Sequence, residues 1–176
     1  LIRLGLLEHV DALSQLDGTP AASRGVHFVP ALSGLGCPHW DRSAAGLWIG
    51  LDAATGRDDL VKSVLEGVAF RAAEVLDALG AAPGRVISVD GGVTKCRYFL
   101  RFLATVTQRR LTVPGIAELT AYSAARLAAG GGRNSKVWEE PASGNDIEPD
   151  TDHRQWRAMF AAARLRSSGW RQDEPA

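Results

Sequence analysis

Apolar residues along the chain form two kinds of pattern, short continuous runs and segments with helical spacing. Residues 25–32 and 46–51 are short apolar runs bounded by glycine, which is typical of buried strands. Between them, residues 33–41 contain glycines and a proline that prevent regular structure, whereas Leu35 and Trp40 favour burial. We therefore expect an ordered loop between two strands.

The longest periodic segment lies between residues 60 and 79, where leucine, valine and alanine recur at helical spacing. This spacing predicts a helix that Asp58 or Asp59 caps and that ends at Gly80. Several charged residues fall on the other side of this helix, and we expect them on a solvated face. They are Glu66, Arg71 and Glu74.

The second half of the chain alternates strands with helices. A strand is expected over residues 85–90, followed by a glycine turn and a helix with Phe99, Phe102, Leu103 and Val106 on one face. Residues 111–114 predict a short strand, and residues 119–129 predict an alanine-rich helix whose small side chains allow close approach to a sheet. This order favours a layered α/β architecture.

The last part of the chain carries weaker patterns. Residues 133–149 contain proline, glycine, asparagine and acidic residues, which predicts a surface connection. A final helix is expected to begin at Thr151 or Asp152, with Trp156 and Met159 as packing residues.

Composition narrows the class of protein. The chain has 176 residues, 45% of them hydrophobic, and a formal net charge of zero. This size fits one domain with a real core, and the neutral charge argues against nucleic-acid and membrane-surface partners. Two cysteines and no apolar run of membrane-spanning length make a cytoplasmic protein the default expectation. The charge is uneven, however, because residues 85–133 carry a net +6.

The turn at residues 90–95, Asp-Gly-Gly-Val-Thr-Lys, carries most of the chemical signal. Adjacent glycines permit positive φ and leave no side chain between backbone and ligand, and a following helix directs unpaired N–H groups at the same point. Lys95, Arg97 and Arg101 add a local positive field that favours an anion such as phosphate. The alternative is a simple tight turn with Thr94 as an N-cap.

Other sites are excluded by their missing motifs. The sequence has no P-loop, no G-x-G-x-x-G fingerprint and no G-x-S-x-G nucleophile elbow. Its four histidines and two cysteines are scattered, so no zinc site is expected.

Residues 28–41, Phe-Val-Pro-Ala-Leu-Ser-Gly-Leu-Gly-Cys-Pro-His-Trp-Asp, resemble a segment shared by the FGGY carbohydrate kinases, in its glycerol kinase version. Residues 46–66 fit a second signature pattern of that family, and the segments around Gly92, 111–114 and 118–125 resemble the rest of its C-terminal domain. The resemblance covers nearly the whole chain but only the second half of such a kinase.

The resemblance implies a fold and an activity. It implies that residues 1–176 form an actin-like ATPase (ribonuclease H-like) domain of the α/β class, with a mixed sheet and flanking helices. With an N-terminal domain absent from this chain, it would form a cleft where ATP, Mg²⁺ and glycerol meet. The family's catalytic aspartate lies upstream, and Asp11, Asp17 and Asp41 do not match it. We therefore expect no catalytic residue and no metal ligand here, and detectable formation of glycerol 3-phosphate by this chain alone would contradict that.

The same resemblance assigns the nucleotide side of the cleft to Gly91, Gly92, Thr94 and Cys96. Gly92 matches the glycine that approaches the nucleotide, and Cys96 stands where the family usually has an asparagine near the adenine. A thiol is only a weak donor, so we expect altered nucleotide affinity or base preference. At a helix N-terminus, Cys96 is further expected to be an unusually acidic, alkylatable thiol.

Two alternatives stay open. One is a non-catalytic, actin-like module that binds nucleotide or a partner protein, and the other is a kinase for another polyol or sugar. Half of a two-domain cleft should expose an apolar face, so we also expect the isolated chain to self-associate or to be marginally soluble.

Overall fold

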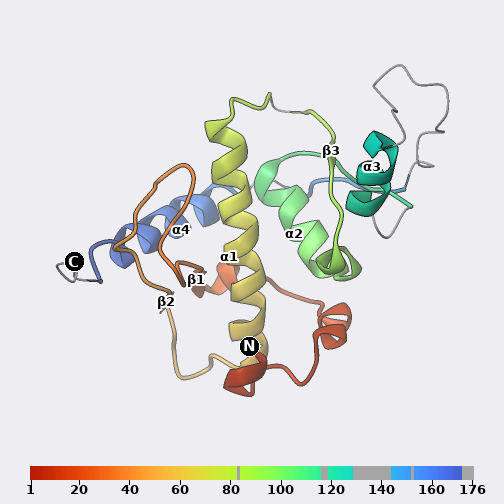
Figure 1. Cartoon of the computed structure of the whole chain (residues 1–176). Coiled ribbons are helices and arrows are strands. Elements are labelled where there is room, and N and C mark those ends of the chain that lie inside the picture. Colours follow the sequence, from red (N-terminus) through yellow and green to blue (C-terminus); the bar gives the residue numbers. More distant parts are fainter. Residues whose placement is uncertain (83, 116–118, 129–143, 152, 172–176) are drawn as a thin grey trace.

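Helix α1 (Arg57–Ala78) runs through the middle of the molecule and separates two groups of elements (Figure 1). The computed structural model describes residues 1–82, 84–115, 119–128, 144–151 and 153–171. On one side of α1 lie strands β1 and β2 and helix α4, and on the other lie helix α2 and strand β3. Three short 3₁₀ helices precede α1: η1 (Ile2–Leu4), η2 (Val10–Gln15) and η3 (Ala21–Arg24).

Strands β1 (His27–Val29) and β2 (Leu47–Ile49) form an antiparallel pair in which Phe28 faces Trp48. The two expected strands are thus confirmed, each shorter than its apolar run. Strand β1 is buried throughout, whereas β2 is only half-buried. The Trp48 ring lies 4.5 Å from that of Phe28, and its Nε1 donates a 3.0 Å hydrogen bond to Ser63 on α1.

The loop between these strands is ordered, as expected, but it does not bury both of its large apolar residues. Leu35 is buried, and its N–H donates to the Asp41 carbonyl at 2.7 Å. Trp40 is 75% exposed and has a φ of 50°, so the prediction of its burial is wrong. The loop is therefore anchored to the core through Leu35 and not through Trp40.

Helix α1 begins at Arg57, just ahead of the two aspartates expected to cap it. Gly56 is the N-cap, and its N–H donates to the Asp59 carboxylate at 2.8 Å, so Asp59 stabilises the helix start from its first turn. The helix ends two residues before Gly80, which has a φ of 62° and permits the chain to turn away.

The second sheet is mixed, with the strand order β3 (Ile87–Ser88), β4 (Leu111–Val113), β5 (Asn145–Ile147). Strands β3 and β4 are parallel and are joined through α2 (Arg97–Thr107), which confirms the expected strand, helix and strand. Strand β5 pairs antiparallel with β4, inside the segment expected to be only a surface connection. That expectation failed because the exposed Asn145 and Asp146 give β5 no apolar pattern.

The two remaining helices differ in how they pack. Helix α3 (Leu119–Ala128) lies at the periphery with most of its described side chains exposed, so the expected close approach to a sheet is wrong. Helix α4 (Arg154–Ser167) begins after His153 rather than at Thr151, and Asp152 lies outside the described residues. Its Phe160 is buried, and Trp156 packs against the core as expected.

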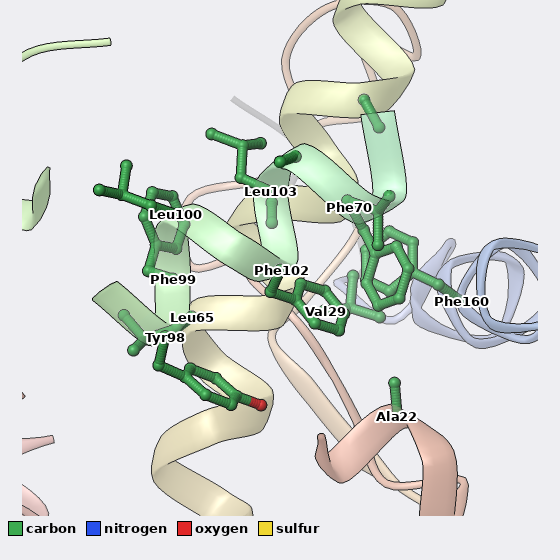
Figure 2. Packing of buried hydrophobic residues seen from close by; sticks show 14 of the residues in the cluster. Ala22, Val29, Leu65, Phe70, Tyr98, Phe99, Leu100, Phe102, Leu103 and Phe160 are labelled. Carbon is green, nitrogen blue, oxygen red and sulfur yellow. The ribbon is translucent and has the colours of Figure 1, made fainter. Parts of the chain in front are cut away.

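Aromatic rings join the two sides of the molecule across α1. The Phe70 ring on α1 stacks on Phe160 of α4 at 4.6 Å and meets Phe102 of α2 edge-on at 5.3 Å (Figure 2). Helix α1 therefore has apolar neighbours on both flanks.

This packing overturns the expectation that the charged residues of α1 face solvent. Glu66 is 1% exposed, and the side chains of Arg71 and Glu74 are less than 20% exposed. Arg71 pairs with Glu74, which also accepts from Arg164 of α4 at 3.0 Å, and Arg71 donates to the Cys37 carbonyl at 2.6 Å. With both flanks of α1 covered, charged side chains in its middle are paired instead of solvated.

Candidate functional site

The turn between β3 and α2 has a different shape from the one expected. Helix α2 begins only at Arg97, because the 3₁₀ helix η4 (Gly92–Lys95) intervenes. The prediction that the glycines sit directly at the N-terminus of α2 is therefore wrong. The Thr94 hydroxyl donates to the Gly91 carbonyl at 2.7 Å, so it closes the turn and does not cap α2.

The two glycines have separate roles in this turn. Gly91 has a φ of 97°, a conformation that side chains rarely adopt, so the backbone itself requires glycine there. Gly92 has no such φ, and a Cβ placed on it would meet no atom within 4 Å. The space above Gly92 is thus open to a ligand, and a side chain there would fill it without disturbing the fold.

A small cavity of about 70 Å³, which we call the Gly92 hollow, lies between this turn and η2. Its lining residues are Val10, Asp11, Leu13 and Ser14 on one wall and Gly92, Val93, Lys95 and Cys96 on the other. Lys95 is the one cation in this lining, and Asp11 is the one anion. Sequence reasoning identified the turn wall but missed the η2 wall, because residues 10–14 carry no recognisable motif.

The Cys96 thiol lies beneath the surface of the hollow. Cys96 is the N-cap of α2 but is only 1% exposed. Burial raises the pKa of Cys96 above its ordinary value, and the backbone N–H groups of Phe99 and Tyr98 oppose this rise only in part. The expectation of an unusually acidic thiol is therefore wrong, because desolvation outweighs the helix N-terminus.

The three basic residues expected to share one field are spread over three cavities. Lys95 lines the Gly92 hollow. Arg97 and Thr94 line a neighbouring cavity of about 390 Å³ beside β4 and β5. Arg101 lines a third cavity of about 530 Å³ between α2 and the start of α4. Only Lys95 therefore faces the same space as Gly92.

Residues 6–131 match the C-terminal domain of the FGGY family of carbohydrate kinases. The chain belongs to this family. It is 42% identical over 130 residues to a glycerol kinase from Gloeobacter violaceus, a match covering 72% of this chain and 26% of the relative. It is 37% identical over 174 residues to an apulose kinase from Pectobacterium atrosepticum, covering 89% of this chain and 34% of that one.

Solved structures agree with this assignment. The fold is similar to that of Plasmodium falciparum glycerol kinase with ADP, with a TM-score of 0.78 and 26% identity, over 95% of this chain and 35% of that one. The FGGY chain has the actin-like ATPase fold, here as an α/β domain with a mixed sheet and flanking helices. It spans about a third or less of the length of the kinases that it matches.

Two further findings bear on ligands and surroundings. Within the described ranges, histidine, cysteine and acidic side chains do not gather in groups of three or more that could hold a metal ion. Over the same part of the chain, each helix is too short or too polar to cross a membrane.

Proposed function

We propose that this FGGY chain is the C-terminal, nucleotide-binding domain of a kinase that transfers a phosphoryl group from ATP to glycerol. The observation that carries the proposal is the open position above Gly92, in a chain whose family consists of carbohydrate kinases. The ADP named with the similar Plasmodium glycerol kinase supports a nucleotide as the ligand.

The residues of the hollow suit the phosphate end of a nucleotide. Gly92 leaves the backbone bare, so a phosphate can approach its N–H groups closely. Lys95 on the same wall supplies a positive charge that favours the anion. Asp11 on the opposite wall disfavours a phosphate close to η2, which directs it to the turn.

The rest of the reaction is assigned to residues outside this chain. Phosphoryl transfer needs a base on the attacking hydroxyl and Mg²⁺ on the triphosphate, and the described residues do not offer a ligand set for the metal. We place the base and the metal with an N-terminal domain that closes over the hollow. This chain contributes binding and orientation of the nucleotide.

The acceptor and the nucleotide base are the open points of the proposal. Similarity to an apulose kinase supports a sugar as an alternative acceptor to glycerol. Cys96 is buried and stands where the resemblance leads us to expect an asparagine, which supports the alternative of a module that binds nucleotide without catalysis.

Calorimetric titration of the chain with ADP tests the nucleotide site. We expect wild type to bind and Gly92→Asp to bind at least about tenfold more weakly, because the added carboxylate occupies the space above the turn and repels phosphate. Gly36→Asp is the matched control, since Gly36 is also exposed, has no positive φ and would meet no atom within 4 Å. Equal binding by wild type and Gly92→Asp would remove the site.

A further inference from the structure

The most deeply buried charged residue in the described part of the chain is Glu66, which is 1% exposed. Glu66, in the middle of α1, accepts hydrogen bonds from the backbone N–H groups of Ala21 at 2.8 Å and Ala22 at 2.7 Å. Its carboxylate also accepts from the Tyr98 hydroxyl. Both oxygens are thus occupied by donors from two other elements, η3 and α2.

The chemistry of this group favours a fixed geometry. Burial raises the pKa of the Glu66 carboxyl, and the three donors act against that rise. Burial and the adjacent Glu66 raise the pKa of Tyr98, so its hydroxyl keeps its proton and remains a donor. A buried carboxylate is costly unless every donor is in place, so η3 and α2 must hold their positions around it.

Each wall of the hollow is followed, a few residues later in the sequence, by a residue that donates a hydrogen bond to Glu66. Ala21 lies six residues beyond the end of η2 at Gln15, and Tyr98 lies six residues beyond Gly92. Lys62, one turn before Glu66, also holds the segment between η2 and Ala21, because it donates to the Thr19 carbonyl at 3.3 Å. Figure 2 shows the Tyr98 ring lying across α1, with Ala22 on the neighbouring 3₁₀ turn.

Backbone hydrogen bonds join the turn wall to the first turn of α2, which carries Tyr98. Cys96 donates its N–H to the Val93 carbonyl at 3.0 Å, and Leu100 donates to the Cys96 carbonyl at 3.2 Å. Turn η4 and the first turn of α2 are therefore one hydrogen-bonded unit, and Tyr98 is its polar link to α1. The apolar contacts of α2 with α1 are not directional, so this hydrogen bond fixes the orientation of the two helices in a way that apolar contact alone does not.

We propose that Glu66 is a positioning residue that sets the width of the Gly92 hollow. It holds α2, which follows the turn wall, through Tyr98, and it holds η3, which follows the η2 wall, through Ala21 and Ala22. The hollow accepts a nucleotide phosphate only while both walls are held, so the bond between Tyr98 and Glu66 controls nucleotide affinity without touching the nucleotide. This role rests on the proposed function of the hollow.

Tyr98→Phe is the sharpest variant, because it keeps the ring among its apolar neighbours and removes only the link to α2. Ser63→Ala is the matched control on the same helix, since it removes the part-buried hydrogen bond that Trp48 of β2 donates to α1, away from α2. Thermal melting of both variants verifies folding and compares their losses of stability. Each is made in a Cys37→Ser background, which leaves Cys96 as the sole thiol.

Two measurements test the proposal. We expect Tyr98→Phe to bind ADP about tenfold more weakly than wild type and to react with iodoacetamide at Cys96 at least about fivefold faster, because the turn wall moves away from η2. Ser63→Ala should leave both quantities unchanged despite its similar loss of stability.

The outcomes separate this proposal from the nucleotide site itself. If wild type binds ADP and Tyr98→Phe binds it equally well, the positioning role is overturned while the site stands. Equal effects of both variants would also overturn it, because they would reflect general loosening. If wild type fails to bind ADP, both the proposed function and the control of nucleotide affinity by Glu66 are wrong. Faster alkylation of Tyr98→Phe would then show only that the bond between Tyr98 and Glu66 holds the turn wall in place.

Discussion

His27 is a titratable side chain enclosed by apolar neighbours. It is 3% exposed, and neither ring nitrogen has a hydrogen-bond partner among the described residues. Its ring lies 5.8 Å from Phe70 and 6.4 Å from Phe160. Desolvation lowers the pKa of His27 to about 4, so the folded state holds this imidazole neutral.

Because the unfolded chain takes up a proton near pH 6.5 and the folded chain only near pH 4, His27 makes the free energy of unfolding depend on pH. Its contribution is complete above pH 6.5 and is lost as the pH falls towards 4. At pH 5 we expect a loss of about 2 kcal/mol relative to pH 7.5, measured by urea denaturation. His27→Leu should lack this part of the pH dependence, and an identical pH profile for the variant would contradict the assignment.

The exposure of some residues can be predicted from the local sequence pattern, whereas the burial of others depends on tertiary packing. The open position at Gly92 agrees with the glycine pair in the sequence, because a residue without a side chain leaves the space above its backbone free. The burial of Glu66 and Cys96 could not, since it depends on which elements cover α1 and α2. From the sequence alone, a charged residue on a helix is predicted to face solvent, and only the packing of neighbouring helices shows that it is buried.

At the scale of elements, the crossing of α1 over β1 is set by one glycine. A Cβ on Gly67 would lie 2.2 Å from the Phe28 carbonyl oxygen, so helix and strand touch through their backbones. A substitution there must push α1 away from the β1 strand.

Gly67→Ala should therefore destabilise the chain by roughly 2 kcal/mol, even though alanine is the better helix former by about 1 kcal/mol. Thermal and urea unfolding measure this loss. Gly36→Ala, at an exposed position with free space, should cost less than about 0.5 kcal/mol. A stability gain for Gly67→Ala would mean that α1 and β1 are not in backbone contact.

Elements with a clear apolar pattern could be predicted from the sequence, whereas β5, which has none, could not. Helices α1 and α2 carry enough apolar residues at helical spacing to fix their positions within a few residues. Strand β5 is held by its pairing with β4 and has mainly exposed residues, so its existence depends on a neighbour distant in sequence. For the same reason, η2 could not be predicted as a wall of the hollow, because it meets the Gly92 turn only in the folded structure.

At the scale of the whole molecule, several large apolar side chains are exposed on the surface. Leu32, Trp40 and Trp170 are each more than 70% exposed, and Arg171 holds the chain beside Trp170 to the Leu32 carbonyl at 2.6 Å. Large exposed apolar side chains of this kind favour contact with another protein surface when they lie together.

We therefore expect the isolated chain to self-associate, with a weight-average mass in sedimentation equilibrium that rises with protein concentration. Trp40→Ser with Trp170→Ser should reduce the association without lowering the melting temperature, because both side chains lie outside the core. A mass of 18.8 kDa at all concentrations would argue against a kinase domain with an uncovered apolar face.

The unequal burial of the two cysteines makes the chain convenient for fluorescence work. Cys37 is half-exposed on the loop that Arg71 holds, whereas Cys96 is enclosed and has a raised pKa. A maleimide dye added briefly at neutral pH should therefore attach to Cys37 without any mutation. Energy transfer from such a dye to a labelled nucleotide would then report the distance between the loop and the hollow in solution.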